Sequence, residues 1–167
     1  MLFRSLQPGF ALRPVWQGQP CDTGPWSRRA LGAPAHSAGD RLVARLVELV
    51  RLAAEPEADH LARRAQPLGD GAGLAWVEMA RGVLVYRVAL SDDRQQLRDA
   101  RVLAPTEWNT NPQGGLASAL ARLDPRDADA ATRLAMAFDP CVPFQVECAV
   151  AAHNSPMPSQ EVPRCTN

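Results

Sequence analysis

The sequence contains no lysine, so all 18 of its basic residues are arginines, and 18 acidic residues balance them. The formal net charge is therefore zero, and the chain has no broad positive field to attract nucleic acid or an anionic membrane surface. Without lysine it also cannot complete the G-x-x-x-x-G-K-[ST] loop that cradles nucleotide phosphates. The composition disfavours nucleic acid and membranes as partners and excludes a P-loop.

Long apolar runs and secretion signals are absent as well. No window approaches the roughly 18 to 20 apolar residues of a membrane-spanning helix, so we expect no membrane insertion. Pro8 and Arg13 interrupt the apolar residues near the N-terminus, which argues against a signal peptide. The four cysteines are too few and too unevenly spaced for a secreted disulfide framework. We therefore expect a cytoplasmic protein.

Metal ligands at short spacing are also missing. Cys141, Cys148, His153 and Cys165 form a C-x6-C-x4-H-x11-C series, and Cys21 lies far from them in the sequence. This series lacks the C-x-x-C and H-x-x-x-H pairs of structural zinc sites. None of the three histidines has a serine or cysteine in a nucleophile-elbow pattern beside it, which disfavours a catalytic triad. On spacing alone Cys141 is a buried small residue, a metal ligand or a nucleophile, and the first is the commonest.

The length of 167 residues suits one domain with one core. We expect residues 1–153 to form that domain, with residues 1–38 as a loop-rich N-terminal segment that is dense in proline and glycine. Residues 154–167 are polar and proline-rich, so we expect a flexible C-terminal tail.

Apolar periodicity predicts the secondary structure of the remainder. An apolar stripe through Leu42, Leu46, Leu49 and Val50 predicts a helix over 40–54 with Asp40 as its cap. A second short helix is expected over 57–66, strands over 74–79, 83–90 and 97–104, an irregular loop anchored by Trp108 over 105–115, and helices over 115–122 and 127–137. The predicted class is α+β, with helices packed around a small antiparallel sheet.

Four stretches, in chain order, resemble the large subunits of nickel-iron hydrogenases. They are PVWQGQPCDTGPWSRR (14–29), ARGVLVYRV (80–88), LAPTEWNTNP (103–112) and AFDPC (137–141). These are similar to the family's E-x-G-P-L-A-R, P-R-G-x-L-x-H, P-T-T-W-N-x-x-P and S-F-D-P-C-x-x-C-x-x-H motifs. The resemblance implies a fold like the C-terminal part of a large subunit.

The same resemblance implies that this chain is not an enzyme. The family holds its nickel-iron centre with four cysteines in two C-x-x-C pairs, because soft thiolates suit both metals. Here only Cys141 occupies such a position, since Phe144 stands where the bridging cysteine would be and Glu147 replaces the terminal histidine. Loss of three of the four thiolates excludes the complete centre and disfavours nickel binding.

The positions that surround the iron in the family are better preserved. Arg81, Pro105 and Thr106 match residues near its diatomic ligands, where a guanidinium and a hydroxyl can donate hydrogen bonds to cyanide. This pattern resembles hydrogenase maturation proteins of the HupK/HoxV type. It implies an assembly factor that scaffolds a transient Fe(CN)2CO precursor on Cys141, with maturation chaperones and the immature large subunit as partners.

Other interpretations remain open at this stage. The chain could be a metal-free module that mimics the large subunit to bind chaperones, or a degenerate large-subunit fragment. Arg81 could simply pair with Glu78, and Thr106 could make only a local turn hydrogen bond. Arg28 could form a structural ion pair or contact a partner.

Overall fold

The computed structural model describes residues 9–29, 37–58 and 60–148, and its main element is a four-stranded antiparallel sheet. The strands are β3 (Arg63–Gly69), β4 (Ala72–Met79), β5 (Gly82–Leu90) and β6 (Leu97–Leu103), and they follow one another across the sheet in chain order. Together with the helices below, this meander confirms the predicted α+β class. The last three strands agree closely with the predicted ones.

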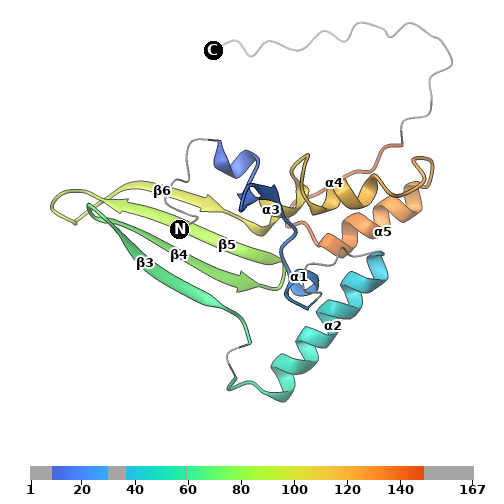
Figure 1. Ribbon diagram of the computed structural model, residues 1–167, viewed down its shortest axis with the longest axis horizontal. Coiled ribbons are helices and arrows are strands. Elements are labelled where there is room, and N and C mark those ends of the chain that lie inside the picture. The colour runs from blue at the N-terminus through green and yellow to red at the C-terminus, as the bar shows by residue number, and fades with distance from the viewer. Residues whose placement is uncertain (1–8, 30–36, 59, 149–167) are drawn as a thin grey trace, which may run out of the picture.

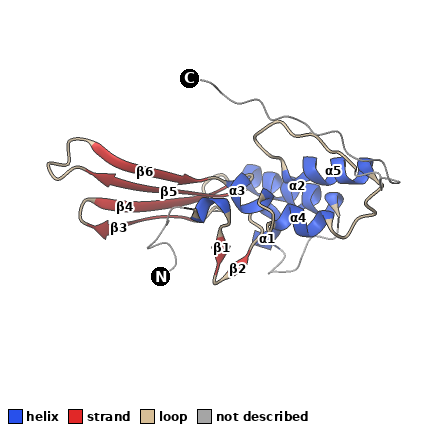
Figure 2. Ribbon diagram, turned by 90° about the horizontal axis from the view of Figure 1, so that it is seen from above, coloured by secondary structure: helices blue, strands red, loops and turns tan. Residues whose placement is uncertain are grey.

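The helices gather at one end of the sheet, where β4 turns into β5 and β6 ends (Figures 1 and 2). The elements outside the sheet are η1 (Phe10–Leu12), the short hairpin β1 (Val15–Trp16) and β2 (Gln19–Pro20), α1 (Pro25–Arg29), α2 (Ala38–Ala54), α3 (Pro105–Thr110), α4 (Gly115–Leu120) and α5 (Ala128–Phe138). The helices α4 and α5 confirm the two that the sequence predicts there.

The helix predicted over 57–66 is wrong, because this part of the chain leads into β3. Arg63 through Pro67 pair in register with Val77 through Gly73 of β4, and the register shifts between Pro67 and Gly69. β3 lies at the edge of the sheet, where a proline is tolerated because its missing N–H breaks no ladder on the open side. Pairing with β4 makes these residues a strand. The paired residues lie about 6 to 14 positions further along the chain, so the local residue pattern does not reveal the pairing.

The loop predicted over 105–115 is also partly wrong, because its first six residues form α3. Pro105 stands in the first turn, where its fixed φ and missing N–H fit a helix start. The backbone N–H of Ala104 donates to the Glu107 carboxylate, which supplies one half of a capping box. Trp108 anchors this segment as predicted, with 2% of its surface exposed.

α2 begins two residues earlier than predicted, and its cap is Ser37 rather than Asp40. The Ser37 hydroxyl accepts from the Asp40 N–H, and the Asp40 carboxylate accepts from the Ser37 N–H. Asp40 is therefore the third helical residue of a capping box and not the cap itself. The apolar stripe of this helix is exposed: Leu42, Leu46, Leu49 and Val50 each keep more than half of their surface open to solvent.

The core lies between the sheet and α3. Leu74, Val85 and Leu103 come from three neighbouring strands and pack with Trp108 into one buried cluster. Phe10 of η1 meets the Trp108 ring edge to face, with the ring centroids 6.2 Å apart. This cluster fixes α3 on the sheet end and thereby places the residues that follow Leu103.

Some residues named in the predictions lie outside the part of the chain that the structure describes. His153, Cys165 and the tail over 154–167 lie outside the described residues, as do residues 1–8 and 30–36 of the N-terminal segment. Among the helices that the structure describes, none is long and apolar enough to cross a membrane.

Candidate functional site

Three segments that are distant in the sequence meet at the helical end of the sheet. The first is the Ala80–Arg81 turn between β4 and β5, the second is the first turn of α3, and the third is the stretch that follows α5. They carry all four residues that the sequence singled out: Arg81, Pro105, Thr106 and Cys141.

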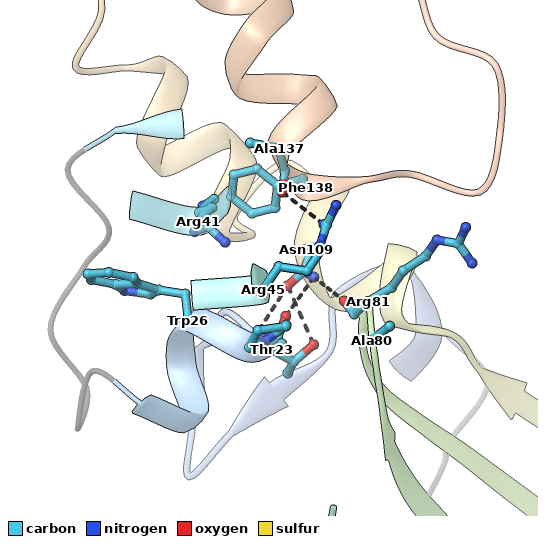
Figure 3. Close-up of a pocket in the computed structure, with 11 residues that line it drawn as sticks. Thr23, Trp26, Arg41, Arg45, Ala80, Arg81, Asn109, Ala137 and Phe138 are labelled. Carbon is cyan, nitrogen blue, oxygen red and sulfur yellow. Dashed lines mark hydrogen bonds between the residues drawn. The ribbon is translucent and has the colours of Figure 1, made fainter. Parts of the chain in front are cut away.

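Asn109 locks the Arg81 turn to α3. Its side-chain amide donates to the backbone carbonyls of Thr23, at 2.9 Å, and of Arg81, at 3.2 Å. Its side-chain carbonyl accepts from the Thr23 N–H at 2.9 Å, and Asn109 is only 4% exposed (Figure 3). One buried amide therefore satisfies three backbone groups from two other segments, which fixes their relative positions.

Pro105 is buried and supports the site from behind. It packs on Gly82, which has a φ of 140°. Glycine adopts this backbone conformation readily, whereas residues with a side chain rarely do. A Cβ added to Gly82 would lie 3.2 Å from the Pro105 Cβ and closer still to the Thr23 hydroxyl. The role of Pro105 in the structure is thus to bring α3 close to the turn, while its ring is turned away from solvent.

Arg81 forms an ion pair with Asp139, not with Glu78. Its Nε lies 3.0 Å from Asp139 Oδ2, and Glu78 instead accepts from the Ala62 N–H. Arg45 approaches the same carboxylate at 3.8 Å. Two guanidinium groups thus flank one carboxylate, so these three side chains together carry a formal charge of +1. Figure 3 shows the Arg81 guanidinium pointing away from Asn109.

Cys141 is exposed, and its thiol lies 3.2 Å from the Thr106 hydroxyl. The interpretation of Cys141 as a buried small residue is therefore wrong. Thr106 does more than close a local turn, because its hydroxyl reaches a residue 35 positions away. A hydroxyl at this distance can donate a hydrogen bond to a thiolate or to a ligand held by the sulfur.

A narrow crevice lies next to the Ala80–Arg81 turn, and its lining includes Thr23, Arg41, Arg45, Asn109 and Phe138. Its volume of about 10 Å³ accommodates roughly one water molecule. Arg41 closes one side, with its guanidinium 3.5 Å above the centre of the Phe138 ring and paired with the Asp22 carboxylate. A ligand larger than a water molecule does not fit in this crevice.

Sequence reasoning missed Asp139 and Arg45 as parts of this site. Asp139 follows α5 in the left-handed conformation, with φ of 53°, and this turn redirects the chain toward Thr106. The AFDPC stretch contains Asp139, so a carboxylate two residues before Cys141 was the available signal.

Arg28 forms a structural ion pair. Its guanidinium donates two hydrogen bonds to the Glu48 carboxylate, at 2.6 and 2.8 Å.

The other described cysteines do not join Cys141. Cys21 is half-buried, and burial, with a smaller contribution from Asp22, raises the pKa of its thiol to about 11. Cys148 is free and half-buried. Within residues 9–29, 37–58 and 60–148, no group of three or more His, Cys, Asp and Glu side chains could hold a metal ion. Any metal bound at Cys141 would therefore need ligands that the described protein residues do not supply.

The amino-acid sequence of this chain is similar to those of several hydrogenase expression/formation proteins. The chain is 43% identical to the hydrogenase expression/formation protein HoxV of Cupriavidus necator, over 84% of this chain and 41% of that protein. It is 34% identical to HupK of Bradyrhizobium diazoefficiens, over 81% and 41%, and 35% identical to HupK of Rhizobium leguminosarum, over 87% and 43%. The chain is homologous to these hydrogenase expression/formation proteins. The resemblance to the HupK/HoxV type is confirmed.

The homology covers most of this chain but about two fifths of each of these curated relatives. No protein-family model matches the chain. No solved structure matches it either.

Proposed function

We propose that the chain acts in hydrogenase maturation as a scaffold that holds an Fe(CN)2CO unit at Cys141 for transfer to an immature large subunit. The observation that carries the proposal is the contact between the Thr106 hydroxyl and the exposed Cys141 thiol, two residues after Asp139, which pairs with Arg81. Its functional context comes from the homologous hydrogenase expression/formation proteins.

The chemistry of these side chains suits such a cargo. A thiolate is a soft ligand for low-valent iron, and a single thiolate makes a releasable attachment. Cyanide ligands are good hydrogen-bond acceptors. Thr106, which contacts the Cys141 thiol, and Arg81, which pairs with Asp139, are hydrogen-bond donors. The excess of one positive charge among Arg45, Arg81 and Asp139 favours an anionic metal unit near them.

The exposure of Cys141 also fits a transfer step. A resident cofactor is normally enclosed, whereas a cargo that passes between proteins must be reachable by a second thiolate. Cys141 is exposed, so its thiol can be reached from solvent. Under this proposal the iron unit approaches and leaves from the solvent side, and maturation chaperones and the immature large subunit are its exchange partners.

Infrared spectroscopy of the anaerobically purified protein, coexpressed with a hydrogenase maturation system, tests the proposal. We expect cyanide and carbonyl stretching bands that disappear in Cys141→Ala and persist in Cys148→Ala, a nearby free cysteine that lies seven residues further on. Arg81→Ala should shift the cyanide bands more than the carbonyl band. Bands of full intensity in Cys141→Ala would refute the assignment of Cys141.

A metal-free interaction module is the second candidate. The observation that favours it is the lack of a three-ligand cluster among the described residues. It predicts that the chain binds maturation chaperones equally well as wild type and as Cys141→Ala, and that the wild-type complex contains no iron. Iron analysis of the isolated complex separates the two functions.

A further inference from the structure

Three of the five charged side chains of α2 point toward the rest of the protein. Arg41, which is 8% exposed, pairs with Asp22, and Glu48 pairs with Arg28 at 2.6 Å. Arg45 donates to the Ala137 carbonyl at 3.2 Å. These three residues of α2 recur at i, i+4 and i+7, so they share one helix face, and that face contacts α1 and α5.

The opposite face of α2 is apolar and exposed. A surface helix normally buries its apolar face and exposes its charged face. In α2 the apolar face is exposed and the charged face is turned toward the protein. In Figure 1 the helix lies at the rim of the molecule, beyond α1 and α5. Five aliphatic side chains keep between 52% and 61% of their surface open: Leu42, Val43, Leu46, Leu49 and Val50. We call these five residues the α2 stripe.

The apolar surface continues past the N-terminal end of the stripe. Leu42 also lines a groove of about 670 Å³ between α2, α4 and α5. Leu123, Leu134 and Met136 line the same groove, and Met136 is 62% exposed. Isolated exposed hydrophobic residues are common, but a contiguous patch of this kind marks an interaction surface.

The spacing of the stripe identifies what fits on it. Leu42 and Val50 are each four residues from Leu46, and Val43 and Leu49 are each three residues from it. A two-fold axis at Leu46 would therefore place an identical antiparallel helix in register. Leu46 would meet its own copy, and every other aliphatic residue of the stripe would meet an aliphatic residue.

The charges beside the stripe suit the same antiparallel arrangement. Asp40 and Arg51 lie on one flank of α2, near its two ends. In an antiparallel pair each Asp40 stands close to Arg51 of the second copy, whereas in a parallel pair the two copies of this flank lie on opposite sides of the contact and no such charge pair forms. The net charge of zero adds no overall repulsion between copies.

From these observations we infer that the α2 stripe is the contact surface of a homodimer, in which α2 packs antiparallel against α2 of a second copy around Leu46. The inference is independent of iron binding, because Cys141 is not part of the stripe. It concerns the association of two copies of the chain, and it does not depend on whether the chain binds an iron unit.

Analytical ultracentrifugation tests the dimer directly. We expect the wild-type chain to sediment at twice its mass of 18.1 kDa at micromolar concentrations. Leu46→Asp should weaken association at least about 100-fold, since it places two carboxylates against each other at the axis. Leu97→Asp is the matched control, because Leu97 on β6 is similarly exposed, at 58%, and should leave the dimer unchanged.

Cysteine cross-linking tests the orientation, in a background in which Cys141, Cys148 and Cys165 are replaced by serine. Leu46→Cys should form a covalent dimer under mild oxidation. Leu42→Cys should cross-link with Val50→Cys in a mixed sample but poorly with itself, because an antiparallel pair separates the two copies of residue 42 by about 12 Å along the axis.

Several results would overturn the inference. One is a wild-type chain that stays monomeric at 100 µM or above, and another is a dimer that survives Leu46→Asp. Self-cross-linking of Leu42→Cys as efficient as that of Leu46→Cys would indicate parallel pairing and contradict the axis. Protection of the stripe by a different polypeptide, without any dimer, would assign the surface to that partner instead.

Discussion

Replacing Asn109 with alanine tests whether one buried amide holds the candidate site together. Asn109 makes hydrogen bonds of 2.9, 2.9 and 3.2 Å with the backbone of Thr23 and Arg81. Asn109→Ala removes all three and leaves a donor and two acceptors of the backbone without their partner. The turn that carries Arg81 then loses its side-chain link to α3.

The expected loss follows from the number of bonds. A hydrogen bond in a folded protein contributes about 1 kcal/mol, and leaving a buried partner unsatisfied costs at least as much. Three bonds give a decrease of about 3 kcal/mol in the free energy of unfolding, which corresponds to a roughly 100-fold change in the folding equilibrium. Thr110→Ala is the control, because Thr110 is exposed and donates only to the Thr106 carbonyl within α3. It should cost less than about 0.5 kcal/mol.

Urea denaturation followed by tryptophan fluorescence measures both changes. The midpoint should fall in Asn109→Ala while the denaturant dependence stays constant, because the surface exposed on unfolding is unchanged. A loss below about 1 kcal/mol in Asn109→Ala, or an equal loss in Thr110→Ala, would show that the three bonds do not support the turn.

Three further predictions concern single residues. Gly82→Ala should lower the free energy of unfolding by at least about 2 kcal/mol, since it combines a positive φ with a steric clash; Gly69→Ala, with a positive φ but open space, should lose only about 1 kcal/mol. Glu48→Ala should cost about 3 kcal/mol in chemical denaturation, because it leaves Arg28 unpaired at 13% exposure, and Glu48→Gln should cost less. Burial raises the pKa of the Cys21 thiol to about 11, so the folded state stays protonated while the unfolded chain ionises. Stability should therefore fall as the pH rises from about 9 to 11, and Cys21→Ala should remove this fall.

The sheet and the later helices could be predicted because their signals are local. A run rich in apolar and β-branched residues predicted β5, alternation of apolar and polar residues predicted β6, and Pro140 predicted the end of α5. The conformations of residues 57–69 and 105–110 depended on contacts instead. Pairing with β4 made β3 a strand, and packing of Trp108 in the core favoured α3 over a loop.

Part of the site was likewise visible in the sequence. Arg81, Pro105, Thr106 and Cys141 were identified through their resemblance to hydrogenase large-subunit motifs, and the structure brings the segments that carry them together. The sequence could not show that Asp139 is the partner of Arg81, because 58 residues separate them. Whether these residues hold an iron unit remains a prediction for the infrared experiment.

The sequence by itself determined the class of the fold, most of the strands and helices, and the kinship with hydrogenase expression/formation proteins, since these rest on local periodicity and on motif identity. Only the tertiary structure decided which way α2 faces. Its residue pattern shows an apolar face and a charged face, but not that Asp22, Arg28 and Ala137 would draw the charged one inward. Burial of that face depends on partners far away in the chain, and it leaves the α2 stripe exposed.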